Sequence, residues 1–420
     1  MAKKIILIAL LVAVVVLVAG IIFFEIEPEN KNIDFSPANA QSKTDKTIRF
    51  DKNGKLKILH IADTHLDYDR HFDASIWVIA EACDVEKPDL VVLTGDNTHP
   101  NEDPEKTKKL INALMNIFES RKIPVAVTFG NHDSEGGPMT REDIMEYYQT
   151  FSCVISTDNS ENFKNCATFN VPVFASDSDK VNFNLWVFDS GDYDEDESRH
   201  YDRVRTEQIE WYKKTAAKLK EENGGKTVNS VVFQHIIVPE IYDVLKKSDS
   251  KQPYAIKHIY NEEEFYMFDS EQVNYGTLNE KPCPGYYNDG QFDALVETGD
   301  VLAMFTGHDH TNAFGVRNKN IDIYTSPMTR YKGLAYTTQY GYRVVEIDEN
   351  DTSTYKTRVE RLYDIFDFSY IKTAKENGDK YSTRIAFELA VKGAVQEGFM
   401  KLYQSVVELI TGRQVTYPDQ

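Results

Sequence analysis

The sequence has few cysteines, no excess of positive charge and, after its first 24 residues, no long hydrophobic run. Four cysteines in 420 residues are too few for a disulfide scaffold. The 67 acidic and 47 basic residues give a net charge of −20. This charge argues against a nucleic-acid partner, because excess Lys and Arg hold phosphate backbones. The single apolar run excludes a multi-spanning membrane protein, and no internal repeat is evident.

What remains is the composition of a chain that buries a core, with 41% hydrophobic and 27% charged residues. Helical patterns at Ala74–Glu86 and Pro104–Ser120 separate the first three of a series of short apolar runs, and Asp103 provides an N-cap for the second helix. This alternation predicts an α/β layered domain whose strands are buried on both faces. The runs, which are rich in β-branched residues, are Leu56–Ala62, Leu90–Thr94, Val125–Phe129, Leu185–Phe188, Val231–Phe233, Val301–Thr306 and Val344–Ile347.

The N-terminal segment carries an uncharged apolar stretch from Ile5 to Phe24, long enough to span a bilayer as a helix. Lys3 and Lys4 precede it, so the positive-inside rule predicts an N-terminal membrane anchor with the rest of the chain outside the cytoplasm. A cleaved signal peptide is the alternative, because residues 38–40 (Ala-Asn-Ala) resemble a cleavage site and the protein would then be secreted. We expect residues 1–24 to form the anchor or signal segment and residues 25–47 a flexible tether.

The chain changes character after residue 350. We expect a main domain over residues 48–350 and a C-terminal extension over residues 351–420. In the extension, Thr354–Leu362 predicts one strand, and apolar residues recur at helical spacing from Phe387 to Leu409. The simplest interpretation is a helix that packs on the main domain, and a docking helix for a partner or a membrane surface is the alternative.

Polar residues follow five of the predicted strands directly, at their C-terminal ends, where open α/β sheets build their sites. Asp, His and Asn suit Zn, Mn or Fe, and one carboxylate that bridges two cations makes a two-metal centre. Each motif alone is weak, but five in this order indicate such a centre. They are Asp63-Thr64-His65, Gly95-Asp96-Asn97, Gly130-Asn131-His132-Asp133, Gln234-His235 and Gly307-His308-Asp309-His310.

From Lys55 to Ile347 this set of motifs resembles the calcineurin-like metallophosphoesterase superfamily, and within it the purple-acid-phosphatase-related phosphoesterases. The resemblance implies a β-sandwich of two mixed sheets flanked by helices. It also implies hydrolysis of phosphate esters by hydroxide that two metal ions activate, with His132 beside the phosphate and Asp133 orienting it. The metal ligands it implies are Asp63, His65 and His310 for the first ion, Asp96 as the bridge, and Asn131, His235 and His308 for the second.

One position departs from the purple acid phosphatases, which carry a tyrosinate ligand where this chain has His99. His65 would fill that place, which puts a ferric-tyrosinate centre in doubt, and we expect His99 to support the site from behind. Outside the ligand set, we expect His60 to be a core histidine, Asp309 to point to solvent, and Cys153 and Cys166 to form a disulfide in an exported protein.

The predicted function is therefore a membrane-anchored, extracytoplasmic phosphomonoesterase that acts on a small phosphate ester with two Mn, Fe or Zn ions. A phosphodiesterase for nucleotides or lipid-linked phosphates is an alternative. The motifs do not separate the two, because the metals handle the phosphoryl group and the pocket rim selects the rest. The alternative from another class is a non-catalytic, metal-bearing binding module at the cell surface.

Overall fold

The computed structural model describes residues 33–39, 41–194, 200–249, 252, 255–269, 273–332 and 339–411. The predicted membrane anchor at Ile5–Phe24 and the first part of the tether lie outside these residues. Among the helices that are described, none combines the length and the apolar character needed to cross a membrane.

One sheet has five strands in the order β15-β14-β1-β2-β3. Strands β1, β2 and β3 are parallel, and β14 and β15 extend the sheet antiparallel to their neighbours. The predicted apolar runs form this sheet to within three residues at each end, because each run is buried. Its strands are β1 (Lys55–Ile61), β2 (Leu90–Thr94), β3 (Val125–Thr128), β14 (Gly341–Asp348) and β15 (Lys356–Arg361).

A second sheet has seven strands in the order β10-β12-β13-β11-β6-β5-β4. Its central strands β13, β11, β6 and β5 are parallel, and the outer ones are antiparallel. The strands are β4 (Phe169–Phe174), β5 (Val181–Phe188), β6 (Ser230–Gln234), β10 (Val273–Thr277), β11 (Val301–Thr306), β12 (Ala313–Asn318) and β13 (Ile321–Thr325). A small third sheet holds β7 (Leu245–Ser248), β8 (Ile256–Lys257) and β9 (Phe265–Phe268).

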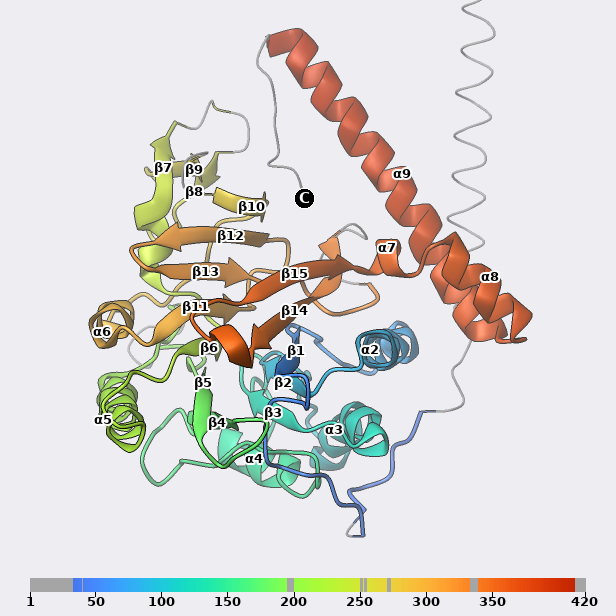
Figure 1. The fold of residues 1–420 in the computed structure, drawn as a ribbon. Coiled ribbons are helices and arrows are strands. Elements are labelled where there is room, and N and C mark those ends of the chain that lie inside the picture. The colour runs from blue at the N-terminus through green and yellow to red at the C-terminus, as the bar shows by residue number, and fades with distance from the viewer. Residues whose placement is uncertain are drawn as a thin grey trace, which may run out of the picture.

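The two large sheets pack face to face, with helices on both outer faces (Figure 1). One hydrophobic cluster fills the space between the sheets, and two more lie under the flanking helices. This arrangement confirms the predicted sandwich of mixed sheets flanked by helices. Helices α2 (Phe72–Glu86), α3 (Pro104–Arg121) and α4 (Arg141–Tyr148) cover the first sheet, and α5 (Thr206–Glu222) and α6 (Gln291–Thr298) cover the second.

Local chemistry sets the start of α3 where the sequence predicts it. The Asp103 side chain accepts a hydrogen bond from the Glu105 backbone N–H at 3.1 Å, and Pro104 occupies the first turn. An N-cap carboxylate satisfies a helix-end donor that has no partner within the helix, and proline needs no such partner.

The C-terminal extension ends in a long helix, α9 (Lys380–Thr411), whose first turns pack on the main domain. Ile385 and Leu389 are buried in the cluster under α2, and the Trp77 indole donates to the Ser382 hydroxyl at 2.9 Å. Beyond these turns α9 runs outward from the sheets (Figure 1). The segments before it are η1 (Pro239–Val244), which precedes β7, then η3 (Glu349–Asp351), α7 (Leu362–Ile365) and α8 (Phe368–Glu376).

The predicted disulfide between Cys153 and Cys166 is wrong. Both thiols are free and fully buried in the hydrophobic cluster on the outer face of the first sheet. Burial raises the pKa of each thiol well above its usual value. Both side chains therefore serve as small apolar groups of the core.

Candidate metal centre

The predicted site residues follow strands of both sheets. Those after β1, β2 and β3 come from the five-stranded sheet, and those after β6 and β11 from the seven-stranded sheet. Because these strands end at one edge of the sandwich, their polar residues meet there. The structure brings all seven predicted ligands to this edge, where short separations between their donor atoms link them.

The backbone at this edge is held in an unusual conformation. Asp63, His65, Asp96 and His308 all have positive φ angles, of 54°, 41°, 49° and 73°. A left-handed residue other than glycine costs about 1–2 kcal/mol, so four such residues in one place mark a site whose geometry the rest of the fold enforces.

Two glycines leave room for the carboxylates. A Cβ atom at Gly130 would lie 2.2 Å from Asp96 Oδ1, and one at Gly307 would lie 2.5 Å from Asp63 Oδ2. Any side chain at either position would displace a carboxylate, so both motifs require glycine.

The first donor group comprises Asp63, His65, Asp96 and His310, whose ligand atoms all lie within 4.8 Å of one another. His65 Nε2 is 3.3 Å from Asp96 Oδ2 and 2.9 Å from His310 Nε2, which is itself 3.7 Å from Asp63 Oδ1. Imidazole nitrogens and carboxylate oxygens at these separations surround a space that a cation of the Zn or Mn type would fit.

The second group comprises Asp96, His235 and His308, all buried. His235 Nε2 lies 3.4 Å from Asp96 Oδ2, 3.2 Å from His308 Nδ1 and 3.3 Å from Asn131 Oδ1. Asp96 is thus common to both groups, which is the geometry expected of a bridging carboxylate. Its Oδ1 accepts from the His132 N–H at 2.8 Å.

Two buried polar atoms support the fit of cations. Asp96 Oδ2 and His308 Nε2 have no hydrogen-bond partner within the described part of the chain. A buried atom without a partner costs about 1–3 kcal/mol, more where a charge is involved. Bound cations would satisfy Asp96 Oδ2, which is the carboxylate oxygen that faces both imidazole groups.

The electrostatics lead to the same conclusion. Burial raises the pKa of Asp63 to about 7, and the nearby Asp96 carboxylate adds to that shift. Burial also lowers the pKa of His310 to about 4, which leaves its imidazole neutral and able to coordinate. Although burial disfavours the charged imidazole of His235, the neighbouring Asp96 carboxylate raises its pKa to about 9. A proton on His235 therefore balances the carboxylates, and a divalent cation would supply this positive charge in its place.

His132 lies at the open side of this centre. Its side chain is 29% exposed, and its ring centroid is 5.3 Å from that of His65. The carboxylate that contacts its Nδ1 atom belongs to Glu135, three residues along the chain, which the sequence analysis did not single out. An acidic residue three positions after the histidine is the only sequence signal for this pair.

Asp133 lies between the loops that follow β2 and β3. Its carboxylate is buried and accepts backbone N–H groups from Asn97 at 2.9 Å, Gly130 at 2.8 Å and Thr98 at 3.3 Å. Asp133 therefore ties the loop after β2 to the loop after β3, and the carboxylate that contacts His132 is that of Glu135.

Three residues outside the ligand set also have definite places. His99 supports the site as predicted, with Nε2 2.8 Å from His65 Nδ1. His60 is the expected core histidine, bound to the Thr94 and Ser326 hydroxyls. The expectation that Asp309 points to solvent is wrong, because it is 1% exposed and accepts from the Cys283 N–H at 3.1 Å.

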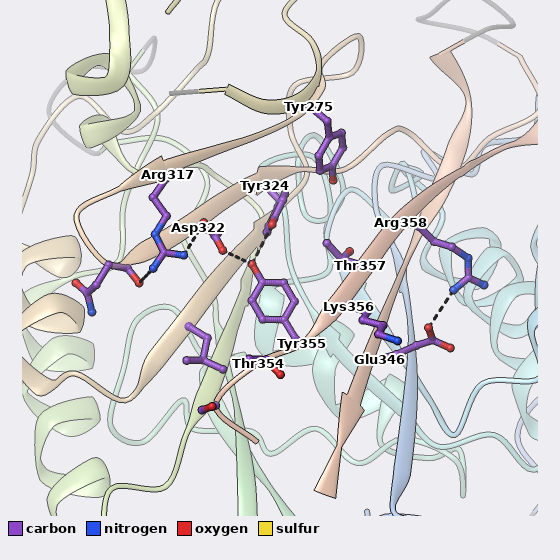
Figure 2. Close-up of a pocket in the computed structure, with 13 residues that line it drawn as sticks. Tyr275, Arg317, Asp322, Tyr324, Glu346, Thr354, Tyr355, Lys356, Thr357 and Arg358 are labelled. Carbon is purple, nitrogen blue, oxygen red and sulfur yellow. Dashed lines mark hydrogen bonds and ion pairs between the residues drawn. The ribbon is translucent and has the colours of Figure 1, made fainter. Parts of the chain in front are cut away.

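A groove with a volume of about 760 Å³ lies away from the metal centre, between strands β12, β13, β14 and β15 (Figure 2). None of the predicted site residues lines it. Its polar groups are largely paired with one another, as in the Arg317–Asp322 and Arg358–Glu346 ion pairs. Volume alone therefore does not identify the metal site. The grouping of ligand atoms does, together with the two of them that have no hydrogen-bond partner among the described residues.

Comparison with known proteins finds related chains and a similar solved structure. The chain is 29% identical to "Probable inactive purple acid phosphatase 29" of Arabidopsis thaliana over 68% of its length and 74% of that protein. It is 26% identical to "Phosphatase DCR2" of Saccharomyces cerevisiae over 63% of its length and 46% of that protein. A solved dimetal phosphatase from Danio rerio aligns with a TM-score of 0.47 at 12% identity, covering 72% of this chain and 98% of that one.

The family evidence covers more than half of the chain. The model of the calcineurin-like phosphoesterase family matches residues 56–312, which include all nine predicted site residues. The purple-acid-phosphatase relatives support the branch that the motifs suggested. The chain belongs to the calcineurin-like phosphoesterase family.

Proposed function

We propose that the chain is an active phosphomonoesterase with two metal ions at the edge of the sandwich. One observation carries the proposal: two groups of inward-facing donors share Asp96, and no donor position is degenerate. Asp63, His65 and His310 would hold one cation, Asn131, His235 and His308 the other, and Asp96 both. The cations would supply positive charge for the phosphoryl group and lower the pKa of attacking water.

The chain's own residues would handle the leaving group. His132 lies at the exposed side of the centre, and the Glu135 carboxylate contacts its Nδ1 atom. His132 would then give a proton to the departing oxygen as a general acid. Asp133 would keep the two loops in register through its three backbone hydrogen bonds.

The name of the Arabidopsis relative, a probable inactive phosphatase, favours a second candidate, a metal-bearing binding module without turnover. The intact donor set of this chain supports the enzyme instead. A matched panel of phosphomonoesters and phosphodiesters, tested with metal analysis of the same sample, separates the candidates. Turnover of monoesters with two metals per chain supports our proposal. Faster turnover of diesters replaces it with the phosphodiesterase, and no turnover by fully loaded protein favours the binding module.

We further propose that the catalytic domain lies outside the cytoplasm, held by the apolar segment Ile5–Phe24. The two lysines before that segment support this orientation. Protease added to intact cells should remove the domain. Protection of the domain until the cells are lysed would reverse the topology, and recovery of the domain in the medium would favour signal cleavage.

A further inference from the structure

Two tyrosines lie against the second donor group of the metal centre. Tyr193 and Tyr201 pair across a short antiparallel bridge, and their rings stack at 5.6 Å between centroids. The Tyr201 ring lies 4.4 Å from the His308 ring, and the Tyr193 hydroxyl accepts from Asn131 Nδ2 at 3.0 Å. Each tyrosine therefore touches one of the residues proposed to bind metal.

Further aromatic side chains continue outward from this pair. The Tyr201 N–H donates to the Tyr260 hydroxyl at 3.3 Å, and the Tyr260 ring lies 4.9 Å from that of Tyr286. The Tyr286 ring lies 4.9 Å from that of Tyr287, and these two side chains are 45% and 41% exposed. We call these five tyrosines the aromatic row. It begins at the metal ligands and ends in solvent.

The aromatic row is not part of the protein core. In the described part of the chain, none of its five residues belongs to the three hydrophobic clusters. Single exposed aromatic residues are ordinary, but a contiguous set beside a reactive centre is typical of a binding surface. Aromatic rings recognise flat, apolar groups through stacking with little loss of side-chain freedom.

The charges near the row argue against a second anionic group on the ligand. The Arg203 guanidinium lies over the Tyr287 ring at 5.1 Å, and it also pairs with Asp289 at 2.7 Å and Asp194 at 2.9 Å. Its charge is therefore already neutralised by carboxylates. A ligand along the row would be held by its rings and not by a further phosphate.

We propose that the aromatic row binds a leaving group that carries a planar aromatic ring, so that the substrates are monoesters of the nucleoside monophosphate or aryl phosphate class. This inference rests on the proposed phosphomonoesterase function. An ester held by its phosphate at the metal centre would extend its leaving group along Tyr201 and Tyr260 toward Tyr286. Tyr286 is the best residue to test, because it is exposed and touches no proposed metal ligand. One face of its ring stacks on His200 at 3.7 Å between centroids, so a ligand would have to use the remaining exposed surface of the ring.

The first experiment compares AMP with glycerol 2-phosphate in metal-loaded protein. We expect a Tyr286→Ala variant to lose about tenfold in kcat/KM for AMP, since stacking of one base on one aromatic ring contributes about that much. The kcat/KM for glycerol 2-phosphate should change less than about twofold on the same reasoning. Phe387→Ala on α9 is the matched control, because Phe387 is 41% exposed against 45% for Tyr286, and it should change neither value.

The second experiment measures adenosine binding by calorimetry, which needs neither phosphate nor turnover. Wild-type protein should bind adenosine, and the Tyr286→Ala variant should bind it markedly less. If esters are hydrolysed but adenosine does not bind and AMP has no advantage, the aromatic row is not the leaving-group site and the phosphomonoesterase stands. If adenosine binds through Tyr286 and no ester is hydrolysed, the row is a ligand site and the proposed function is overturned. Failure of both measurements overturns both.

Discussion

Two polar clusters lie at opposite ends of the same sandwich. The metal centre follows the C-terminal ends of β6 and β11, whereas the groove of Figure 2 includes Leu302 and Asp322 near the N-terminal ends of β11 and its parallel neighbour β13. Both clusters contain carboxylates and draw residues from the same two sheets, but the groove also contains Arg317 and Arg358. The groove has a measurable volume, but the predicted metal ligands of the family lie at the other end of the sandwich.

The difference lies in how each buried carboxylate is satisfied. In the groove, Asp322 accepts from the Tyr355 hydroxyl and pairs with Arg317 at 3.0 Å. In the metal centre, Asp96 Oδ2 has no hydrogen-bond partner among the described residues and faces two imidazoles. A satisfied network stabilises a fold, whereas a buried carboxylate oxygen without a hydrogen-bond partner suits a cation ligand.

The largest expected effect comes from Asp96→Asn. Loss of the shared carboxylate should remove metal from both positions and lower the rate by about 10³-fold or more, because charge stabilisation by the metals contributes several kcal/mol. Metal content per chain and kcat, measured on one sample, check this. Asp322→Asn in the groove is the matched control and should keep its metals. An Asp96→Asn protein with two metals and full activity would remove the distinction between the clusters.

The next effect concerns the open side of the metal centre. His132→Ala should keep its metals and lose about 10²–10⁴-fold on alkyl phosphates, because these poor leaving groups need a proton. The loss should be smaller on nitrophenyl phosphate, whose leaving group departs without one. Glu135→Gln should produce the same pattern with a smaller loss, since it replaces the charged partner of Nδ1 with a neutral amide. Equal losses on both esters would make His132 a phosphate-binding residue, and loss of metal would make it structural.

Asp133 tests whether a residue of the metal-centre motif can be structural. Asp133→Ala should lower the free energy of unfolding by about 2–5 kcal/mol, because it deletes the shared acceptor of three buried backbone N–H groups. Denaturant unfolding measures this. Asp133→Asn should lose less, since one amide oxygen can still accept. An alanine variant with normal stability and no activity would return Asp133 to the catalytic role that the family resemblance implied.

The sequence predicted the parts that depend on local pattern. The runs Leu90–Thr94 and Val301–Thr306 form strands with these same limits. Short runs of apolar and β-branched residues that are buried on both faces favour the interior strands of a sheet. Once the strands were placed, Asp96 and His308 had to meet at one edge, since parallel strands in packed sheets end together. The candidate site therefore followed from strand order and motif position.

What the sequence did not predict depends on contacts between distant segments. Tyr193 meets Asn131, and Asp309 meets the Cys283 backbone, only because loops from separate strands fold over one another. No motif follows strand β12, so the sequence did not predict it. Its place in the sheet depends on its antiparallel pairing with β13. The wrong disulfide has the same origin, because burial in a shared cluster, and not spacing along the chain, decided the state of Cys153.

The smallest expected effect is in the groove. Tyr355→Phe removes the hydroxyl that donates to Asp322 and lies 2.9 Å from the Tyr324 hydroxyl, and it leaves the ring that packs between the sheets. Because Arg317 still pairs with Asp322, the loss in unfolding free energy should be about 1 kcal/mol. Metal content and kcat should equal those of the wild type. A loss of activity with normal stability would show that the groove affects catalysis at the metal centre. The distinction between a structural groove and a catalytic metal centre would then fail.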